Sequence, residues 1–567
     1  MRRKPRFTAV VLAFVLVLWA GTRPFAAAAQ SAGQVARSHR GMVAAAQPLA
    51  SDAGARMLEM GGNAADAAVA AAFAIAVVEP TMNSIGGRNQ ILVRLPDGSV
   101  HGIDGTTQAP AGYDPDSAPQ ASYGYAVIGV PGVVAALMRL HEEYGSLSLE
   151  TVMAPAIDYA ERGFRLLPAE ALRQRHGAER AAEFEGTREA YLKPDGTPYR
   201  AGDLLVQPDL ARTLHTIRDT RGHDFYHGRI AHRIAEDIQA HGGAVTLESL
   251  ERYRALDARI VRGHYRGFDL IGMDVPAAGV VSIQALQILE NFERASMDAP
   301  AWATVVGQAV SLASRELRAL GTDTASARAL SVEWARRVAR AIRVPAGVVP
   351  TGVGEGAGAR GRLPGSAAHP ELPALAARGD EHGHTTHLST ADSAGMFVSL
   401  TQTLGPSMGS AVVTPGLGFL YAATLGGYLG RMKGGARARS FISPLLVLEN
   451  GRPVLVLGAA GGARIVSAVV QAVSHFVDDG LDLERAVAAP RVHMDFTGTL
   501  SVETVPDAGW RAAAVAEMRD LGFAVRPIPR PGAFGRIHGI RFDAATRTWI
   551  GVAEPDWEGT ALAPSGS

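Results

Sequence analysis

The chain has 567 residues, 47% of them hydrophobic, and its 55 lysines and arginines balance its 55 aspartates and glutamates. This composition excludes a largely disordered chain, and the length exceeds what one ordinary hydrophobic core holds. A net charge of zero gives no basic excess for nucleic-acid binding. The absence of cysteine excludes disulfides, thiolate metal sites and a cysteine nucleophile.

The first residues have the pattern of an export signal. Basic residues at positions 2, 3, 4 and 6 precede an apolar run over 7–20, which is too short to span a bilayer comfortably. Small residues follow at 26–29, where a signal peptidase would cut. We expect residues 1–29 to be a signal peptide and the mature protein to be periplasmic or extracellular, with no stable membrane insertion. An uncleaved N-terminal anchor is the alternative.

Helix and strand signals alternate from residue 40 onward. Helices are predicted over 47–60, 64–78, 131–144, 149–162 and 230–241. The helix over 64–78 is almost wholly Ala, Val and Ile, so it must be buried on all sides, and Asn63 can cap it. Strands over 91–95 and 100–103 flank Pro96-Asp97-Gly98 and predict a hairpin.

Residues 345–384 are rich in Gly, Ala and Pro and have no hydrophobic period. This composition predicts a flexible segment, and its length is unusual inside a compact domain. One interpretation is a plain interdomain linker. The other is a tail that must swing away after the chain is cut at its end.

A hairpin is predicted next, with strands over 386–391 and 396–403 around the turn at 392–395. Positions 385 and 403 are equally distant from the turn, so Thr385 should lie opposite or nearly opposite Thr403. Alternation then gives one apolar face and one polar face. The polar face would carry Thr385, His387, Ser389, Ser399, Thr401 and Thr403. Such a face fits a sheet that borders a site.

A second hairpin, over 444–448 and 454–457, is followed by Gly461-Gly462 and a helix over 463–478. A glycine pair between a strand and a helix can leave backbone N–H groups pointing outward, where they would bind an anion. The alternative is an ordinary helix-entry turn.

Several motifs together resemble those of the γ-glutamyltranspeptidase family. They include Gly61-Gly62-Asn63-Ala64-Ala65-Asp66, Glu79-Pro80, Ile85-Gly86-Gly87, Val130-Pro131-Gly132, Thr385-Thr386-His387, Thr401-Gln402-Thr403 and Gly461-Gly462-Ala463-Arg464. The resemblance is collinear from about Gly41 to Ala561 and is weakest over 300–384.

The resemblance implies an α/β (α+β) fold, the four-layer αββα sandwich of N-terminal-nucleophile hydrolases. It also implies cleavage between His384 and Thr385, which would give a large subunit (30–384, with the flexible tail 345–384) and a small subunit (385–567). Thr385 would be the nucleophile with its own α-amine as base, Thr403 would orient it, and Gly461 and Gly462 would stabilise the oxyanion. Without the accompanying family motifs, Thr385 and Thr403 would be interpreted as ordinary strand residues, because threonine favours strands.

The chain departs from the family where the family grips glutamate. Thr106 stands in place of the arginine that binds the α-carboxylate, and Gly405, Thr424 and Gly427 replace the groups that hold the α-amine. Ser440 keeps one serine of a pair, while Phe441 replaces the other. The resemblance therefore implies a carboxylate-bearing or more apolar acyl group rather than γ-glutamyl.

Arg88-Asn89-Gln90 stands where the family continues a glycine run. Arg88 is interpreted either as a relocated anion anchor or as a surface arginine. Arg88, Asn89, Thr106 and Ser440 are the candidate substrate-binding residues.

His382, His384 and His387 have a spacing that suits a metal, but cleavage after His384 would separate them, so no metal and no cofactor are expected. Three functions remain open. The first is an amide hydrolase or acyltransferase acting on a small-molecule amide or peptide. The second is a genuine γ-glutamyltransferase or glutathione hydrolase with a remodelled pocket. The third is a non-catalytic binding protein on the same fold.

Overall fold

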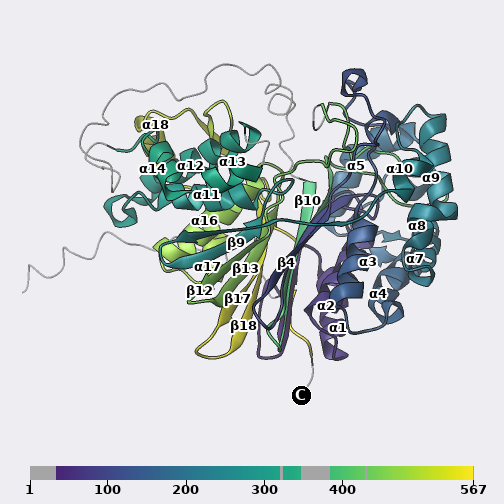
Figure 1. Ribbon diagram of the computed structural model, residues 1–567, viewed down its shortest axis with the longest axis horizontal. Helices are drawn as coiled ribbons and strands as arrows, with labels where there is room; N and C mark the ends of the chain where they lie inside the picture. Colours follow the sequence, from purple (N-terminus) through teal and green to yellow (C-terminus); the bar gives the residue numbers. More distant parts are fainter. Residues whose placement is uncertain (1–32, 320–322, 346–383, 428, 430, 566–567) are drawn as a thin grey trace, which may run out of the picture.

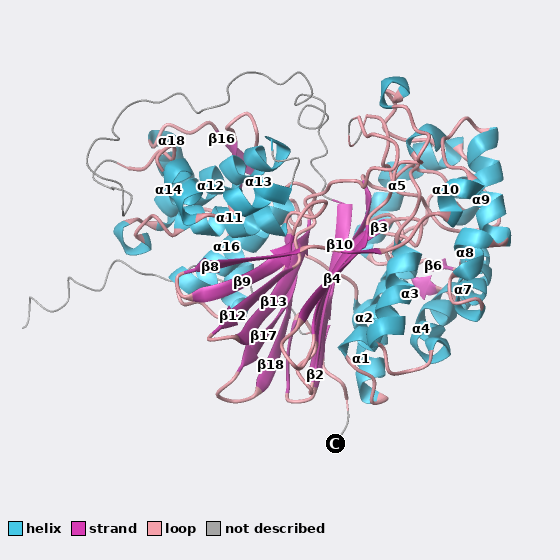
Figure 2. Cartoon of the chain, in the orientation of Figure 1, coloured by secondary structure: helices cyan, strands magenta, loops and turns pink. Residues whose placement is uncertain are grey.

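The computed structural model describes residues 33–319, 323–345, 384–427, 429 and 431–565. Two seven-stranded antiparallel sheets are stacked face to face at its centre, and helices cover both outer faces (Figures 1 and 2). The predicted four-layer αββα sandwich is confirmed.

The first sheet combines strands from both sides of the His384–Thr385 bond. In order across the sheet these are β19 (Thr560–Leu562), β2 (Gly41–Ala45), β10 (His384–Asp392), β11 (Phe397–Gly405), β3 (Arg88–Arg94), β4 (Val100–Gly105) and β7 (Leu256–Asp257). Strands that precede and follow this bond are thus hydrogen-bonded neighbours. Two segments separated at Thr385 would therefore still share one sheet.

The second sheet is built in the same way. Its order is β1 (Val35–Ser38), β18 (Thr548–Ala553), β17 (Arg536–Asp543), β13 (Arg452–Ala460), β12 (Leu445–Glu449), β9 (Phe268–Met273) and β8 (Ile260–Tyr265). Smaller sheets are formed by β14 (Val492–Met494), β15 (Leu500–Glu503) and β16 (Val525–Ile528), and by β5 (Phe164–Arg165) with β6 (Leu204–Leu205).

One helical layer covers the first sheet. It contains α1 (Pro48–Glu59), α2 (Ala64–Val78), α3 (Val133–Tyr144), α4 (Leu149–Arg162), α5 (Pro168–Glu183), α6 (Glu185–Tyr191), α7 (Pro208–Asp219), α8 (His223–His227), α9 (Arg229–Ala240) and α10 (Leu247–Glu251). Every residue of α2 is buried, as its almost wholly apolar sequence predicts, and the Asn63 side chain caps it by accepting from the backbone N–H groups of Ala65 and Asp66.

The other helical layer covers the second sheet. It contains α11 (Gly279–Leu289), α12 (Ala299–Ala319), α13 (Asp323–Ala329), α14 (Val332–Ala339), α16 (Arg464–Asp478), α17 (Leu483–Ala488) and α18 (Ala512–Asp520). Because α16 follows β13 directly, the Gly461-Gly462 turn joins the second sheet to this layer.

The predicted elements agree with the structure except at some ends. Strand β3 begins at Arg88 rather than at residue 91, because Arg88, Asn89 and Gln90 pair with Thr403, Gln402 and Thr401 of β11. The polar sequence of residues 88–90 is untypical of a buried strand, yet all three side chains are buried, Asn89 on the face toward the helices and its two neighbours on the other face. The helix predicted from residue 131 begins at Val133.

The predicted signal peptide (1–29) and nearly all of the predicted flexible tail (345–384) lie outside the described residues. Within the described part of the chain, no helix combines the length and apolar character needed to cross a bilayer.

Candidate active site

Thr385 lies at the start of β10, on the face that points toward the second sheet. The register pairs Thr386 with Gln402 and His387 with Thr401, around a bulge between His384 and Thr386. This is the predicted register, and it brings Thr385 Oγ1 to 3.1 Å from Thr403 Oγ1. Both threonines are almost fully buried, with 4% and 3% of their surface exposed, so water has little access to either hydroxyl.

Two hydroxyl groups converge on the carbonyl group that precedes Thr385. Thr403 Oγ1 donates to His384 O at 2.6 Å, and Thr385 Oγ1 lies 2.6 Å from the same oxygen. Thr403 Oγ1 also accepts a hydrogen bond from Gly405 N at 2.9 Å, which fixes its orientation. The Thr385 hydroxyl, the Thr403 hydroxyl and the carbonyl of the His384–Thr385 bond are therefore in mutual contact in the continuous chain.

The Gly461-Gly462 turn lies at the Thr385 end of the sandwich. Ala460, the last residue of β13, pairs with Arg536 of β17, and Arg536 Nη2 donates to Thr385 O at 3.3 Å. Gly461 has φ 142° and Gly462 has φ 57°, values that favour glycine. A Cβ on Gly461 would also lie 2.9 Å from Gly535 Cα, so the turn requires glycine for space. The backbone here can therefore turn tightly into α16 at the end of the strand that pairs with Arg536.

The four candidate substrate-binding residues do not all reach this face. Arg88 pairs directly with Thr403, so its side chain lies on the same face, where it is 2% exposed and Nη1 donates to Ala423 O at 3.1 Å. The surface-arginine interpretation is wrong. Asn89 pairs with Gln402, whose side chain donates to Ala72 O in α2, so strand alternation turns Asn89 toward the helices. The structure does not bring Asn89 to the site.

Thr106 and Ser440 have different surroundings. Thr106 follows β4, and both its backbone N–H and its hydroxyl donate to Asp104 Oδ1, at 2.8 and 2.5 Å. Its hydroxyl proton is thus already committed. Ser440 is anchored by its N–H to Pro276 O at 2.9 Å, and its buried hydroxyl oxygen has no hydrogen-bond partner among the described residues. Of the two, only Ser440 has an uncommitted hydroxyl.

His387 is part of a buried hydrogen-bond chain. Ser389 Oγ donates to His538 O, so it accepts from His387 Nε2, and His387 Nδ1 must then accept from the Thr401 hydroxyl at 2.7 Å. Burial lowers the pKa of His387 to about 3, so the ring stays neutral at ordinary pH. His382 lies outside the described residues.

A buried charged cluster behind Thr385 escaped the sequence analysis. Arg536 is stacked on the Trp557 ring, 3.9 Å from its centroid, and Arg173 Nη2 contacts Glu79 Oε1 at 3.4 Å and Glu170 Oε2 at 2.7 Å. Burial raises the pKa of Glu79 to about 7, while Arg173 and Arg536 act to lower it and Glu170 to raise it. The signals in the sequence were a carboxylate, Glu79, ending a nearly all-apolar helix, and an arginine, Arg536, opening a strand next to the apolar Ile537.

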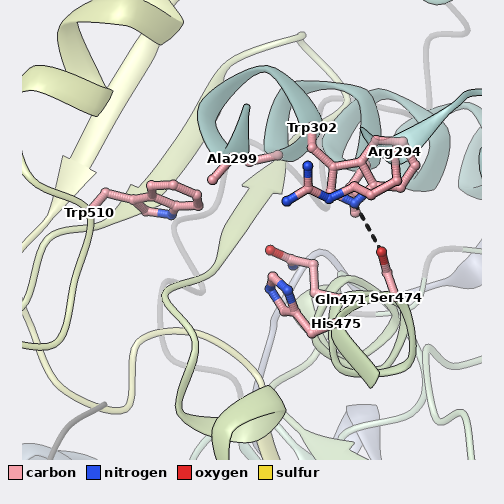
Figure 3. Close-up of a pocket in the computed structure, with 9 residues that line it drawn as sticks. Arg294, Ala299, Trp302, Gln471, Ser474, His475 and Trp510 are labelled. Carbon is pink, nitrogen blue, oxygen red and sulfur yellow. Dashed lines mark hydrogen bonds between the residues drawn. The ribbon is translucent and has the colours of Figure 1, made fainter. Parts of the chain in front are cut away.

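A small cavity between α12, α16 and Trp510 is not a substrate site. Its lining includes Trp302, Gln471 and His475, and Trp302 Nε1 donates to Ser474 Oγ at 3.0 Å across it (Figure 3). A volume of about 10 Å³ has room for one water molecule at most. The cavity lies in the helical layer that covers the second sheet, and Thr385 belongs to the first sheet.

The stacked antiparallel sheets, with a threonine at the start of a central strand, define the fold of N-terminal-nucleophile hydrolases. The solved cephalosporin acylase from Bacillus halodurans superposes with a TM-score of 0.82 at 27% identity, covering 95% of this chain and 98% of that one. Among sequences, the Glutathione hydrolase proenzyme of Bacillus subtilis (strain 168) is 29% identical over 96% of both chains. The Acylase ACY 1 proenzyme of Pseudomonas sp. (strain V22) is 31% identical over 94% of this chain and 95% of its own.

The family model for Gamma-glutamyltranspeptidase matches residues 50–563. The chain belongs to the γ-glutamyltranspeptidase family, and is a hydrolase or acyltransferase of the type found there.

Proposed function

We propose that the chain is a self-processing amide hydrolase or acyltransferase. Thr385 first cleaves the peptide bond that precedes it and then serves as the catalytic nucleophile. The observation that carries this proposal is the contact of Thr385 Oγ1 and Thr403 Oγ1 with His384 O, each at 2.6 Å. Relatives named as proenzymes support a precursor that is cut.

The cleavage step balances without a cofactor. Thr385 Oγ1 attacks the carbonyl carbon of His384, and the hydroxyl of Thr403 stabilises the oxyanion. The C–N bond then breaks, the hydroxyl proton passes to the departing amine, and His384 is left as an ester on Thr385. Water hydrolyses that ester and regenerates the hydroxyl. The products are a large subunit ending at His384 and a small subunit that begins with Thr385.

The mature cycle would use the same atoms. The freed α-amine of Thr385, with an ordinary pKa of about 8, takes the hydroxyl proton as the threonine attacks the substrate amide. The backbone N–H groups of Gly461 and Gly462 stabilise the oxyanion, each by about 3–4 kcal/mol. The amine of the substrate leaves, and water or an acceptor amine removes the acyl group.

We propose that the acyl group carries a carboxylate but no α-amine, as in glutaryl amides. Arg88 places a buried cation on the face of Thr403, beside Ala423. By contrast, Thr106, Gly405, Thr424 and Gly427 carry no charge that would pair with an ammonium. A γ-glutamyl group would have to bury its ammonium unpaired, which is costly. The acylase relatives are consistent with this choice.

Genuine γ-glutamyl hydrolysis is the second candidate, because the relatives include glutathione hydrolases matched over 96% of the chain. The deciding experiment compares kcat/KM for glutaryl and γ-glutamyl p-nitroanilides on the purified protein. A preference for the glutaryl compound is expected, and a clear preference for the γ-glutamyl compound would refute the assignment of the acyl group.

Self-processing is tested by intact mass. Wild-type protein should give a small subunit that starts at Thr385, while Thr385→Ala should remain one chain. A protein that stays uncut and is fully active would overturn the mechanism, and an uncut, inactive wild type would favour a binding protein. The mass of the large subunit also tests our proposal that the signal peptide is removed during export.

A further inference from the structure

Among the described strands, none pairs with Thr385 itself. Strand β2 pairs with β10 only from Leu388 to Asp392, and the bulge in the pairing with β11 leaves out Thr385. Arg536 Nη2 donates to Thr385 O at 3.3 Å. A guanidinium group thus binds the backbone of the proposed nucleophile where the strand ladder is interrupted.

This guanidinium group is buried and is influenced from both sides of the proposed cut. Arg536 is 4% exposed and is stacked on Trp557, and both belong to the segment after Thr385. From the segment before it, Glu79 acts electrostatically to raise the pKa of Arg536 and Arg173 to lower it. Burial lowers the pKa of Arg536 to about 10 while Glu79 opposes this shift, so Arg536 remains a cation at neutral pH.

We propose that Arg536 is a positioning residue of the mature site: it holds Thr385 by the carbonyl oxygen, and its positive charge keeps the new α-amine unprotonated. The inference rests on the proposed role of Thr385 as an N-terminal nucleophile. The α-nitrogen and carbonyl oxygen of one residue are about 3 Å apart, so the cation lies close to the amine. A neighbouring cation disfavours the ammonium form and thereby favours the free base that the mechanism needs.

Other charged or titratable groups lie on the neighbouring elements. Glu79, at the end of α2, and Arg173, from α5, act electrostatically on Arg536. Arg88 of β3 pairs with Thr403, His387 lies two residues after Thr385 on β10, and Arg464 of α16 donates to Ala533 O. On β17, His538 follows Arg536, and burial lowers the pKa of His538 as it does that of His387, so both rings are neutral. The Glu554 carboxylate lies near Arg536 as well. The pKa of Glu79, about 7, falls in the range where the amine would titrate.

The experiment separates the charge from the hydrogen bond. Arg536→Lys keeps a charge and a donor, Arg536→Gln keeps only a donor, and Arg536→Met keeps neither. The pH dependence of kcat/KM is measured on each self-cleaved enzyme with the preferred anilide. The acidic limb should move up by about one pH unit in the Gln and Met variants and stay near the wild-type position in the Lys variant. We expect kcat to fall about tenfold further in Met than in Gln, with KM nearly unchanged.

Glu79→Gln is the matched control. Removing this anion should move the acidic limb in the opposite direction, to lower pH. If the limb disappears in Glu79→Gln, it belongs to Glu79 and the proposal is overturned. The proposal is equally overturned if the limb stays in place in both Arg536→Gln and Arg536→Met.

The proposal would also be overturned if all three Arg536 variants unfold at the wild-type temperature but fail to self-cleave. Arg536 would then serve the precursor reaction and not the mature amine. A failure of the proposed function itself gives a different result, because Thr385→Ala would then retain activity whatever the Arg536 variants do.

Discussion

Thr403→Val tests most directly how the two threonines act together. Valine keeps the branched shape at β11 and removes one hydroxyl, which donates to His384 O at 2.6 Å and accepts from Gly405 N at 2.9 Å. The buried backbone N–H group of Gly405 then has no acceptor, which should lower the free energy of unfolding by about 1–3 kcal/mol. Loss of one oxyanion donor should slow cleavage at Thr385 by about 10²–10³-fold.

Thr401→Val is the control for this loss of stability. Thr401 lies two residues before Thr403, on the same face of β11, and is also buried. Its hydroxyl donates to His387 Nδ1. Both variants should lose similar stability in urea unfolding. Only Thr403→Val should accumulate precursor in a time course followed by intact mass, and its mature fraction should turn over at least about tenfold more slowly. Equal cleavage rates in the two variants would show that Thr403 is a structural strand residue.

Three further predictions address the surroundings of the nucleophile. Arg88→Met should raise KM for a glutaryl anilide at least about tenfold and leave an uncharged acyl anilide unaffected, because it removes the cation beside Thr403; equal effects on both substrates in steady-state assays would argue against a carboxylate anchor. Gly458→Ala should lower the free energy of unfolding by about 1–3 kcal/mol, measured in urea, because its Cβ would lie 2.4 Å from His387 Cε1; a neutral result would mean that the ring can move. The third prediction concerns pH: His387, with its pKa lowered to about 3, contributes stability that is present above pH 6.5 and is lost as the pH falls toward 3. His387→Gln should flatten the dependence of unfolding free energy on pH by up to about 1.4 kcal/mol per pH unit in that window. The comparison with wild type cancels the opposing contributions of Glu79 and Glu503, whose pKa values burial raises to about 7 and about 8. An unchanged slope would contradict a neutral buried His387.

The sequence was sufficient to predict the contact of Thr385 with Thr403 because the contact is set by local rules. The length of the turn at 392–395 fixes the register, and period-two alternation fixes the face. The same rules account for the wrong placement of Asn89. Because β3 starts at Arg88, alternation requires Arg88 and Asn89 to point in opposite directions, so only one of them can lie on the face of Thr385 and Thr403.

The charged cluster behind Thr385 could not be predicted in this way. Glu79, Arg173, Arg536 and Trp557 come from four separate elements, and no turn or period relates their positions. Each residue alone resembles an ordinary solvated charge or core aromatic residue. Their meeting depends on how the helical layer packs against the first sheet and how the second sheet is stacked on it, which is a property of the tertiary structure.

The fold explains why some residues match the motifs of the γ-glutamyltranspeptidase family while others depart from them. Thr385 and Thr403 lie in adjacent strands, and Gly461 directly follows the pairing of Ala460 with Arg536. Their relative positions are fixed by backbone ladders that run through the whole sandwich, so changing them would disturb the sheets. The altered positions lie elsewhere: Thr106 directly follows β4, Gly405 is the last residue of β11, and Thr424 and Gly427 are in the connection to β12. Side chains at strand ends and in loops can change without breaking a ladder. Under the proposed function, this arrangement would let the chemistry persist while the accepted acyl group changes, and the residues that select the acyl group would then lie in the segments around Arg88, Thr424 and Ser440.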